Sequence, residues 1–358
     1  MGENKCHCNL SAVYLGFNSF KGHKRGVENV IDNQASSFNF RRVYYVHFGD
    51  STSVYKYKKF ICISLKRTWW WPLIINSIIY RIQKSKELVV HSHNYLMTVV
   101  LFKRTDIFTV HDGLFYLKKM NGARFLSLFK LIEKVVYTRS GVVHYISRFA
   151  KSQSLISDDK AYVVIPNTSH LEQFCGFLSE QPINDNKKCI LSVRSIEERA
   201  RIDLVIEVAR SLVSEEFRFI IAGKGPLLDH YKNFVSTEKI TNVVFLGYVS
   251  DSDLVLLYKS CDAVLITSEY GEGFGLPIIE AYLFNKPVIA SDRCAIPDVI
   301  INSGFLFNND VSSIKNKIKV VFESELPDFR AYYKNRFSNK IVLSEYRKLY
   351  HADDRQGI

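Results

Sequence analysis

The hydrophobic positions in the first half of the chain fall in short runs that are separated by polar loops. The runs are rich in valine, isoleucine and tyrosine, which is typical of the buried strands of a parallel sheet. They read SAVYLGF, RRVYYVHF, ELVVHSH, DIFTVHDG, GVVHYIS and AYVVIPN. Helical patterns lie between them, the clearest over residues 121–138, where apolar residues recur along one helix face. Strand and helix therefore alternate, and the pattern predicts an α/β domain.

The same alternation restarts after a polar stretch at 176–188, which contains glycine and proline and predicts a linker. The later strand patterns read CILSV, FRFIIAG, NVVFLGY, AVLIT and PVIAS, with helical patterns between them. We therefore expect two Rossmann-like, doubly wound parallel-sheet domains facing a cleft, at 1–175 and 176–330. Residues 331–358 are expected to form a helical segment that packs back on the first domain.

Composition is consistent with large cores in a cytosolic protein. Hydrophobic residues make up 47% of the 358 residues. The seven cysteines are an odd number and lack the spacing of a disulfide framework, and no secretory signal is evident. No apolar run approaches the roughly 18 residues that a membrane span requires. A reducing cytosol is the expected compartment.

Positive charge is concentrated in the first half of the chain. Residues 1–175 hold 25 Lys and Arg against 11 Asp and Glu, a net charge of +14. The remainder holds 23 against 25, a net charge of −2. This asymmetry favours an anionic partner for the first domain, although a solvated basic face with no partner is the alternative.

The stretch SEYGEGFGLPIIEAYLFNKPVIASD, at 268–292, places a glutamate on each side of a glycine-rich turn. Pro277 suits the first position of a helix, so Glu280 is expected in the first helical turn and Glu272 just before the helix. Glycines let a phosphate approach the backbone, and a helix N-terminus attracts it. The carboxylates can accept sugar hydroxyls, so the motif predicts a nucleotide-sugar site. Alternatively, both glutamates only favour the helix dipole.

This stretch resembles the glutamate, seven residues, glutamate motif of family 4 retaining glycosyltransferases. Further pieces follow in that family's order: VVHSH, FTVHDG, VIPN, ILSVR, IIAGKGP and VVFLGYVSDSDLVLLYKSCDAVLITS. The resemblance covers roughly residues 85–310 and implies the GT-B fold, in which the second domain holds most of a nucleotide-sugar donor. It also implies transfer with retention at the anomeric carbon and no protein nucleophile.

The resemblance implies roles for individual residues of the second domain. Glu280 would bind the donor ribose, and Arg194 would face the diphosphate. A second cation would be Arg199, or Arg201 in another alignment. Sugar and phosphates would be held by Glu272 together with the backbone of Gly273, Phe274, Gly275 and Leu276.

Other residues carry weaker signals. The resemblance implies that His111 lies near the reacting centre, although a lone histidine after a strand is equally typical of a core or loop position. Lys224, next to Gly223, is either a phosphate contact or a solvated loop lysine. The family has a loop with a pair of glycines that meets donor phosphate and acceptor. In the similar stretch of this chain the two glycines are separated, as Gly22 and Gly26.

No metal cofactor is expected, because arginines and a helix dipole can neutralise the diphosphate of a UDP- or GDP-linked donor. Asp251 and Asp253 could be taken for an Asp-x-Asp metal site. They are interpreted as the start of a helix capped by Ser250 or Asp251. The family often has a glycine pair after the ASD sequence, where this chain has Cys294 and Ala295, so the donor sugar can differ.

The acceptor is expected at the basic first domain. The segment KRTWWWPLIINSIIYRIQKSK, at 66–86, has the composition of an interfacial membrane segment, and 121–139 adds a second basic, apolar helix. Both are equally compatible with a core position of the apolar residues. The resemblance suggests an undecaprenyl-diphosphate-linked or other glycan acceptor, in O-antigen or capsule synthesis, at the inner face of the cytoplasmic membrane.

Three other functions are compatible with parts of this pattern. A nucleotide-sugar epimerase shares the two-domain fold, and an inactive or merely binding homologue would share the motifs. Nucleic-acid binding by the basic half lacks any zinc-finger, ribonucleoprotein or Gly-x-x-Gly signature, so no nucleic-acid partner is expected.

Overall fold

The computed structural model describes residues 10–20, 26–84, 87–175, 187–213 and 216–351. It contains two compact units. Unit 1 comprises residues 1–167 and 340–358, and unit 2 comprises residues 168–339. Most of the predicted linker, 176–186, lies outside the described residues.

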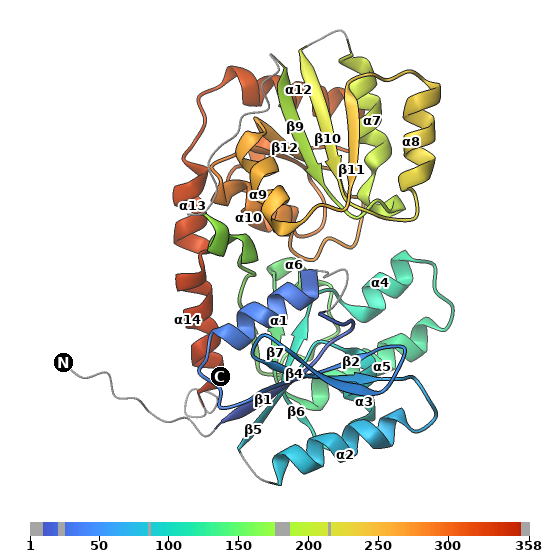
Figure 1. The fold of residues 1–358 in the computed structure, drawn as a ribbon, viewed down its shortest axis with the longest axis vertical. Coiled ribbons are helices and arrows are strands. Elements are labelled where there is room, and N and C mark those ends of the chain that lie inside the picture. Colours follow the sequence, from blue (N-terminus) through green and yellow to red (C-terminus); the bar gives the residue numbers. More distant parts are fainter. Residues whose placement is uncertain (1–9, 21–25, 85–86, 176–186, 214–215, 352–358) are drawn as a thin grey trace, which may run out of the picture. The chain divides into compact units, whose positions relative to one another are not determined.

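Unit 1 is built on an eight-stranded sheet with the order β3-β4-β2-β1-β5-β6-β7-β8 (Figure 1). Its neighbouring strands are parallel, except that β3 runs antiparallel to β4. Each apolar run predicted in the first half forms a strand, whereas β3 and β4 were missed. The strands are β1 (Ser11–Leu15), β2 (Val43–Phe48), β3 (Ser53–Tyr57), β4 (Phe60–Leu65), β5 (Leu88–Ser92), β6 (Thr105–Val110), β7 (Ser140–Tyr145) and β8 (Tyr162–Val164).

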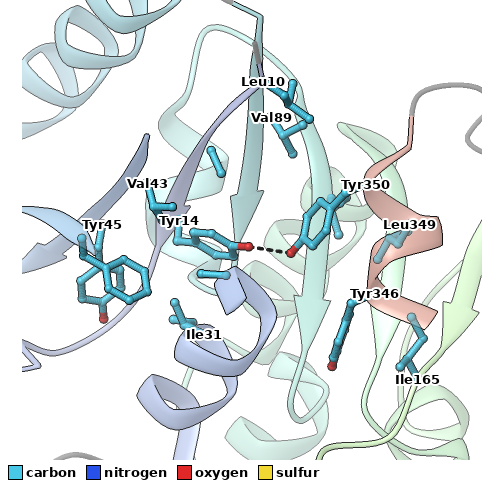
Figure 2. Packing of buried hydrophobic residues seen from close by; sticks show 14 of the residues in the cluster. Leu10, Tyr14, Ile31, Val43, Tyr45, Val89, Ile165, Tyr346, Leu349 and Tyr350 are labelled. Atoms are coloured by element: carbon cyan, nitrogen blue, oxygen red, sulfur yellow. Dashed lines mark hydrogen bonds between the residues drawn. The ribbon is translucent and has the colours of Figure 1, made fainter. Parts of the chain in front are cut away.

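The two faces of this sheet carry separate cores. Along β1, Ala12 and Tyr14 point to one core, and Val13 and Leu15 point to the other, as the two-residue period of a strand requires. The first core packs against α1 (Gly26–Ser36) and α14 (Asn339–Tyr350), as Figure 2 shows in part. The second packs against α2 (Trp71–Gln83) and α3 (Tyr95–Val100). Each fully buried large aliphatic side chain contributes about 1.5–3 kcal/mol.

The helix predicted over 121–138 is shorter than expected. After α4 (Leu114–Met120), α5 spans Leu126–Thr138. Gly122 and Phe125 adopt left-handed backbone conformations, with φ of 64° and 60°, which a continuous right-handed helix does not allow. The prediction was therefore wrong about the first turn, while the apolar spacing over the rest was sound. A short helix, α6 (Arg148–Ser152), follows β7.

Unit 2 is built on a six-stranded, all-parallel sheet with the order β11-β10-β9-β12-β13-β14. The strands are β9 (Lys188–Val193), β10 (Phe217–Ala222), β11 (Val243–Gly247), β12 (Ala263–Ile266), β13 (Val288–Ser291) and β14 (Leu306–Phe307). The α-helices are α7 (Ile202–Ser211), α8 (Leu228–Thr237), α9 (Asp251–Ser260), α10 (Leu276–Leu283), α11 (Ile296–Val299), α12 (Val311–Glu323) and α13 (Phe329–Arg336). The described residues of unit 2 also form the 3₁₀ helices η1 (His170–Phe174), η2 (Glu198–Ala200) and η3 (Ser303–Phe305). The prediction of two parallel-sheet α/β units is confirmed.

Candidate functional site

The glycine-rich turn of unit 2 leads from β12 into α10. Gly275 precedes the helix in a left-handed conformation, with φ of 93°, and a Cβ there would lie 2.9 Å from Ile278 Cδ1. Glycine is therefore favoured there by its backbone conformation, since the flexible end of the Ile278 side chain could move away from a Cβ. Pro277 lies in the first turn, and no side chain caps the helix. The N-cap residue, Gly275, thus offers no side-chain acceptor to the backbone N–H groups of the first turn, which favours an anion there.

Glu280 is the fifth residue of α10, so its predicted place in the first turn was wrong. The helix begins at Leu276, one residue before Pro277, because the left-handed Gly275 already ends the turn. Glu280 is buried and accepts a hydrogen bond from the Tyr258 hydroxyl at 2.9 Å. Burial raises the pKa of its carboxyl, against the opposing effects of His170 and the Tyr258 bond. A glutamate that only favours the helix dipole could stay exposed to solvent, so the burial of Glu280 favours the interpretation as a binding residue.

His170 lies between two carboxylates. Its Nδ1 is 3.9 Å from Glu280 Oε1, and its Nε2 is 3.2 Å from Asp251 Oδ1. Sequence reasoning missed His170 and Tyr258 because they precede Glu280 by 110 and 22 residues and carry no motif of their own. Ser250 caps α9 by accepting from the Asp253 backbone N–H at 3.2 Å, as one of the two predicted caps.

Arg194 and Glu272 come together, although 78 residues separate them. Arg194 Nη1 donates to Glu272 Oε2 at 2.5 Å, and Nη2 donates to the Ser268 hydroxyl at 3.4 Å. The Arg194 side chain is only 6% exposed. Charge-assisted bonds to a buried guanidinium are strong, so this contact fixes the loop before α10 against the end of β9.

The loop after β10 packs against the backbone of Arg194. A Cβ on Gly223 would lie 1.8 Å from the Arg194 carbonyl oxygen, and a Cβ on Gly225 would lie 2.1 Å from that of Ile196. The two loops are joined by a bond from the Ile196 N–H to the Lys224 carbonyl at 2.9 Å. These glycines are therefore needed for loop packing. A donor contact of Gly223 stays a prediction, as does that of Lys224, whose Nζ lies 5.7 Å from the centre of the Tyr248 ring.

The two candidate second cations have different surroundings. Arg199 donates from Nη1 to the Gly271 carbonyl, next to Glu272, and from Nε to Glu197 at 3.0 Å. Arg201 is held by two carboxylates, Asp203 at 2.9 Å and Glu269 at 3.0 Å, and these bonds raise its pKa. Both arginines thus bond to the loop that carries Glu272, Arg199 through the Gly271 carbonyl and Arg201 through the Glu269 carboxylate.

His111 follows β6 in unit 1, where its Nε2 lies 2.9 Å from His93 Nδ1. Burial lowers the pKa of His111 to about 3 and moves that of His93 well below its ordinary value, so both rings are neutral at physiological pH. His93 was not singled out from the sequence, although it lies in the VVHSH stretch. Gly26 is the first residue of α1, and Gly22 lies outside the described residues.

Both histidines line a pocket of about 580 Å³ within unit 1. Polar and charged lining residues come from α1, from α4 and from the segments that follow β1, β4, β5 and β6. Apolar or aromatic ones come from α1, α3, α4 and α5 and from the segment that follows β1. The order β2-β1-β5 makes the space beyond β1 and β5 the point where the sheet's strand order reverses. Such switch points commonly bind ligands at the carboxyl ends of the strands.

Residues 177–339 match the family model described as glycosyl transferases group 1. The match contains the Arg194–Glu272 pair, the glycine turn and Glu280. This part of the chain belongs to the glycosyl transferases group 1 family. The resemblance drawn from the sequence is confirmed, and unit 2 is a glycosyltransferase unit.

Two known relatives of this chain come from bacteria. An uncharacterized 41.2 kDa protein in the cps region of Klebsiella pneumoniae is 27% identical over 179 residues, which are 48% of each chain. The O-antigen chain mannosyltransferase B of Escherichia coli is 41% identical over 75 residues, 21% of this chain and 19% of that protein. This chain thus spans less than half of the length of these relatives.

Solved structures match both units. Anabaena Alr3699/HepE, in complex with UDP and glucose, matches 94% of this chain and 97% of its own with a TM-score of 0.73 and 15% identity. A likeness at this identity concerns the fold, and it agrees with the GT-B class predicted from the sequence.

Proposed function

We propose that the chain is a retaining glycosyltransferase that moves a hexose or N-acetylhexosamine from a UDP- or GDP-linked sugar to a glycan acceptor. The observation that carries the proposal is the buried contact of Arg194 with Glu272 at the entrance to α10, with the buried Glu280 one turn further along. The group 1 family match of the same residues supports it.

The proposed chemistry rests on charge stabilisation by unit 2. Arg194, Arg199 and the N-terminus of α10 stabilise the negative charge that develops on the leaving nucleotide diphosphate. Of the two candidate second cations, Arg199 fits because it contacts the Gly271 carbonyl. Glu280 accepts the ribose hydroxyls, and Glu272 accepts hydroxyls of the sugar. The acceptor hydroxyl attacks from the face that phosphate leaves, and the departing phosphate takes its proton. These charges of the chain itself make a metal ion unnecessary in the proposal.

For the acceptor, we propose a lipid-linked glycan in surface polysaccharide synthesis, O-antigen or capsule. The names of the two relatives, which mention O-antigen and a cps region, support this proposal.

The surface of unit 1 supports it too. Trp69 and Trp70 are 96% and 67% exposed, so the reading that places them in the core was wrong, whereas Ile75 and Ile79 of α2 are buried. Among the described residues, no helix is long and apolar enough to cross a membrane. Peripheral contact with an anionic membrane surface, at its inner face, fits this arrangement.

Donor turnover tests the reaction. A panel of UDP-, GDP- and ADP-sugars is assayed with EDTA, comparing the wild type with Glu280→Gln and with Glu323→Gln, an exposed carboxylate on α12. Loss of the ribose contact should reduce turnover of one donor about a hundredfold, or ~2.7 kcal/mol, and the control should match the wild type. Equal activity of all three proteins contradicts the assignment of Glu280. Conversion of the donor sugar without an acceptor indicates the epimerase, and no turnover or binding indicates an inactive homologue.

Liposome flotation tests the membrane contact. The wild type should float with anionic liposomes and much less with neutral ones, because the basic surface adds electrostatic attraction. Trp69→Ser combined with Trp70→Ser should lose flotation, while Leu246→Ser, an exposed apolar residue of unit 2, should keep it. Flotation that is independent of lipid charge and of both tryptophans contradicts the proposal.

A further inference from the structure

The two carboxylate oxygens of the buried Glu280 have different neighbours. Oε2 accepts from the Tyr258 hydroxyl at 2.9 Å, whereas Oε1 lies 3.9 Å from His170 Nδ1. The second distance exceeds that of a hydrogen bond, so this contact leaves Oε1 able to accept from a ligand. The ring of His170 therefore lies beside the oxygen that a bound ligand would use.

The His170 ring has a carboxylate on each side. Its Nε2 lies 3.2 Å from Asp251 Oδ1 at the start of α9, and its Nδ1 faces Glu280. Nε2 is buried and makes no hydrogen bond among the described residues, so its contact with Asp251 is one of charge. Ionised carboxylates only accept, whereas a protonated imidazole carries a donor on both nitrogens. The protonated ring therefore matches both neighbours and places a positive charge beside Glu280.

The 3₁₀ helix η1 holds the ring of His170 in this place. Ser169, which is fully buried, caps η1 by accepting from the Leu171 backbone N–H at 3.1 Å. Glu172 accepts from the Asn339 backbone N–H at 2.8 Å. The side chain of His170 is itself only 14% exposed. A ring that is fixed in advance adds little ordering cost when a ligand binds.

The positive charge matters because burial opposes the ionised form of Glu280. Burial raises the pKa of this carboxyl, and the charge of His170 acts in the opposite direction. An ionised carboxylate accepts with both oxygens, whereas a protonated one carries a donor O–H on one of them. Hydrogen bonds from hydroxyls to an ionised carboxylate are also stronger than those to a neutral acceptor. Loss of the charge would therefore weaken the contact of Glu280 with a pair of hydroxyls.

We propose that His170 is a positioning residue for Glu280 and sets the preference of the donor site for ribose over deoxyribose. Its ring keeps Oε1 in place and the carboxylate ionised, while the Tyr258 hydroxyl holds Oε2. The inference rests on the proposed function, in which Glu280 accepts the ribose hydroxyls. It deepens that function by naming the residue on which selection of the nucleotide's own sugar depends.

The test measures nucleotide binding to the full chain by titration calorimetry. The probes are UDP, GDP and ADP, each compared with its 2′,3′-dideoxy counterpart, which lacks both ribose hydroxyls. The ratio of the two dissociation constants is the ribose preference. For at least one base, the wild type should prefer the ribonucleotide by at least about tenfold, because the dideoxy form loses hydrogen bonds to a charged group.

Matched histidine variants identify the residue that acts on Glu280. His170→Gln should lower the ribose preference at least about fivefold and leave dideoxy binding within about twofold of the wild type, because only the hydroxyl contacts depend on Glu280. His170→Leu, a second neutral variant, should act in the same way. His230→Gln, at an exposed position of α8, should keep both values. Thermal unfolding shows whether each variant is folded.

A double variant tests whether His170 acts through Glu280. Glu280→Gln alone should remove the ribose preference. Adding His170→Gln should lower it no further, because both residues serve one contact and their effects are therefore not additive. A further loss of ribose preference in the double variant overturns the inference.

The outcomes separate this inference from the proposed function. A ribose preference that falls in Glu280→Gln but persists in His170→Gln overturns the inference and leaves the proposed function in place. Equal losses of ribonucleotide and dideoxy binding in His170→Gln indicate a purely structural role and overturn it as well. A ribose preference that Glu280→Gln leaves unchanged, or no binding of any ribonucleotide by the wild type, contradicts the proposed function and the inference together.

Discussion

Two groups of histidines lie next to each other in unit 1, yet only one of them has all its hydrogen bonds. The His91 and His93 rings stack at 4.8 Å, but they belong to different groups. His91 contacts Tyr350 and Thr109 within a chain of bonds whose ends are satisfied. His93 contacts His111 and keeps an unpartnered nitrogen among the described residues. The comparison separates a histidine group whose hydrogen bonds are all made from one that keeps an unmet hydrogen bond among the described residues.

The hydrogen bonds that link His144, Thr109, His91, Tyr350 and Tyr14 form one chain, called the closed chain here. The direction of each of its bonds follows from the last acceptor, the Ile165 carbonyl. The Ile165 carbonyl can only accept, so His144 Nε2 donates to it at 2.9 Å. Burial lowers the pKa of His144 to about 4, so the ring is neutral and its Nδ1 accepts from Thr109 at 2.9 Å. The Thr109 oxygen must then accept from His91 Nε2 at 2.6 Å. His91 Nδ1 accepts from Tyr350 at 2.7 Å, and Tyr350 accepts from Tyr14 at 2.7 Å (Figure 2).

The largest expected effect is that of pH on unit 1. Burial lowers the pKa of His111 to about 3 and of His144 to about 4, from an ordinary 6.5. Because the unfolded chain binds these protons first, the stability is fully present above about pH 6.5 and is lost as pH falls toward the folded values. Each of the two histidines should reduce the free energy of unfolding by about 2 kcal/mol between pH 6.5 and 4.5.

Urea unfolding at several pH values, followed by fluorescence of the three tryptophans, which all lie in unit 1, measures this loss. His144→Gln serves as the comparison, since removing one such group should flatten the pH dependence. A free energy of unfolding that stays constant between pH 6.5 and 4.5 contradicts neutral, buried rings.

The next prediction replaces one histidine of each group by phenylalanine. His91→Phe removes the partner of two buried hydroxyls, Tyr350 and Thr109, and should lower the free energy of unfolding by about 2–4 kcal/mol. His93→Phe removes only the contact to His111 and should cost less than about half as much. The order reverses for transfer activity, where His93→Phe should lose at least about tenfold and His91→Phe should retain activity below its unfolding temperature.

Urea titrations and donor turnover at 20 °C give both readouts for both variants. Equal destabilisation by the two substitutions, or full activity of His93→Phe, would show that the two groups do not differ in role.

The sequence made one group easier to foresee than the other. Strands β1, β5, β6 and β7 were predicted from their apolar runs, and the register pairs Tyr14 with His91 and Thr109 with His144. Once the strand order is known, the two-residue period of the strands therefore predicts that Tyr14, His91, Thr109 and His144 lie side by side. Strand order is a property of the whole sheet, which is why local patterns could not supply it.

The candidate site in unit 2 also contains residues that the sequence predicted and residues that it did not. Glu272, Glu280 and Arg194 were predicted because a local motif or a family pattern marks each of them. Tyr258 and His170, the neighbours of Glu280, were not predicted, since their contacts arise from packing of α9 and η1. The hairpin of β3 and β4 was not predicted. The late start of α5 was missed because the helical spacing over 121–138 gave no sign of the left-handed backbone at Phe125.

The smallest expected effect tests the direction of the bonds in the closed chain. Tyr14 only donates in the chain Tyr14 to Tyr350 to His91, whereas Tyr350 accepts from one neighbour and donates to the other. Tyr14→Phe therefore removes one bond and leaves no buried donor unpaired, at a cost of about 1 kcal/mol. Tyr350→Phe leaves the Tyr14 hydroxyl without an acceptor and His91 Nδ1 without a donor, so it should cost about twice as much. Urea titrations of the two single variants and the double variant measure both losses and their coupling. If Tyr14→Phe proved the costlier change, the assigned direction of the bonds between Tyr14, Tyr350 and His91 would be contradicted.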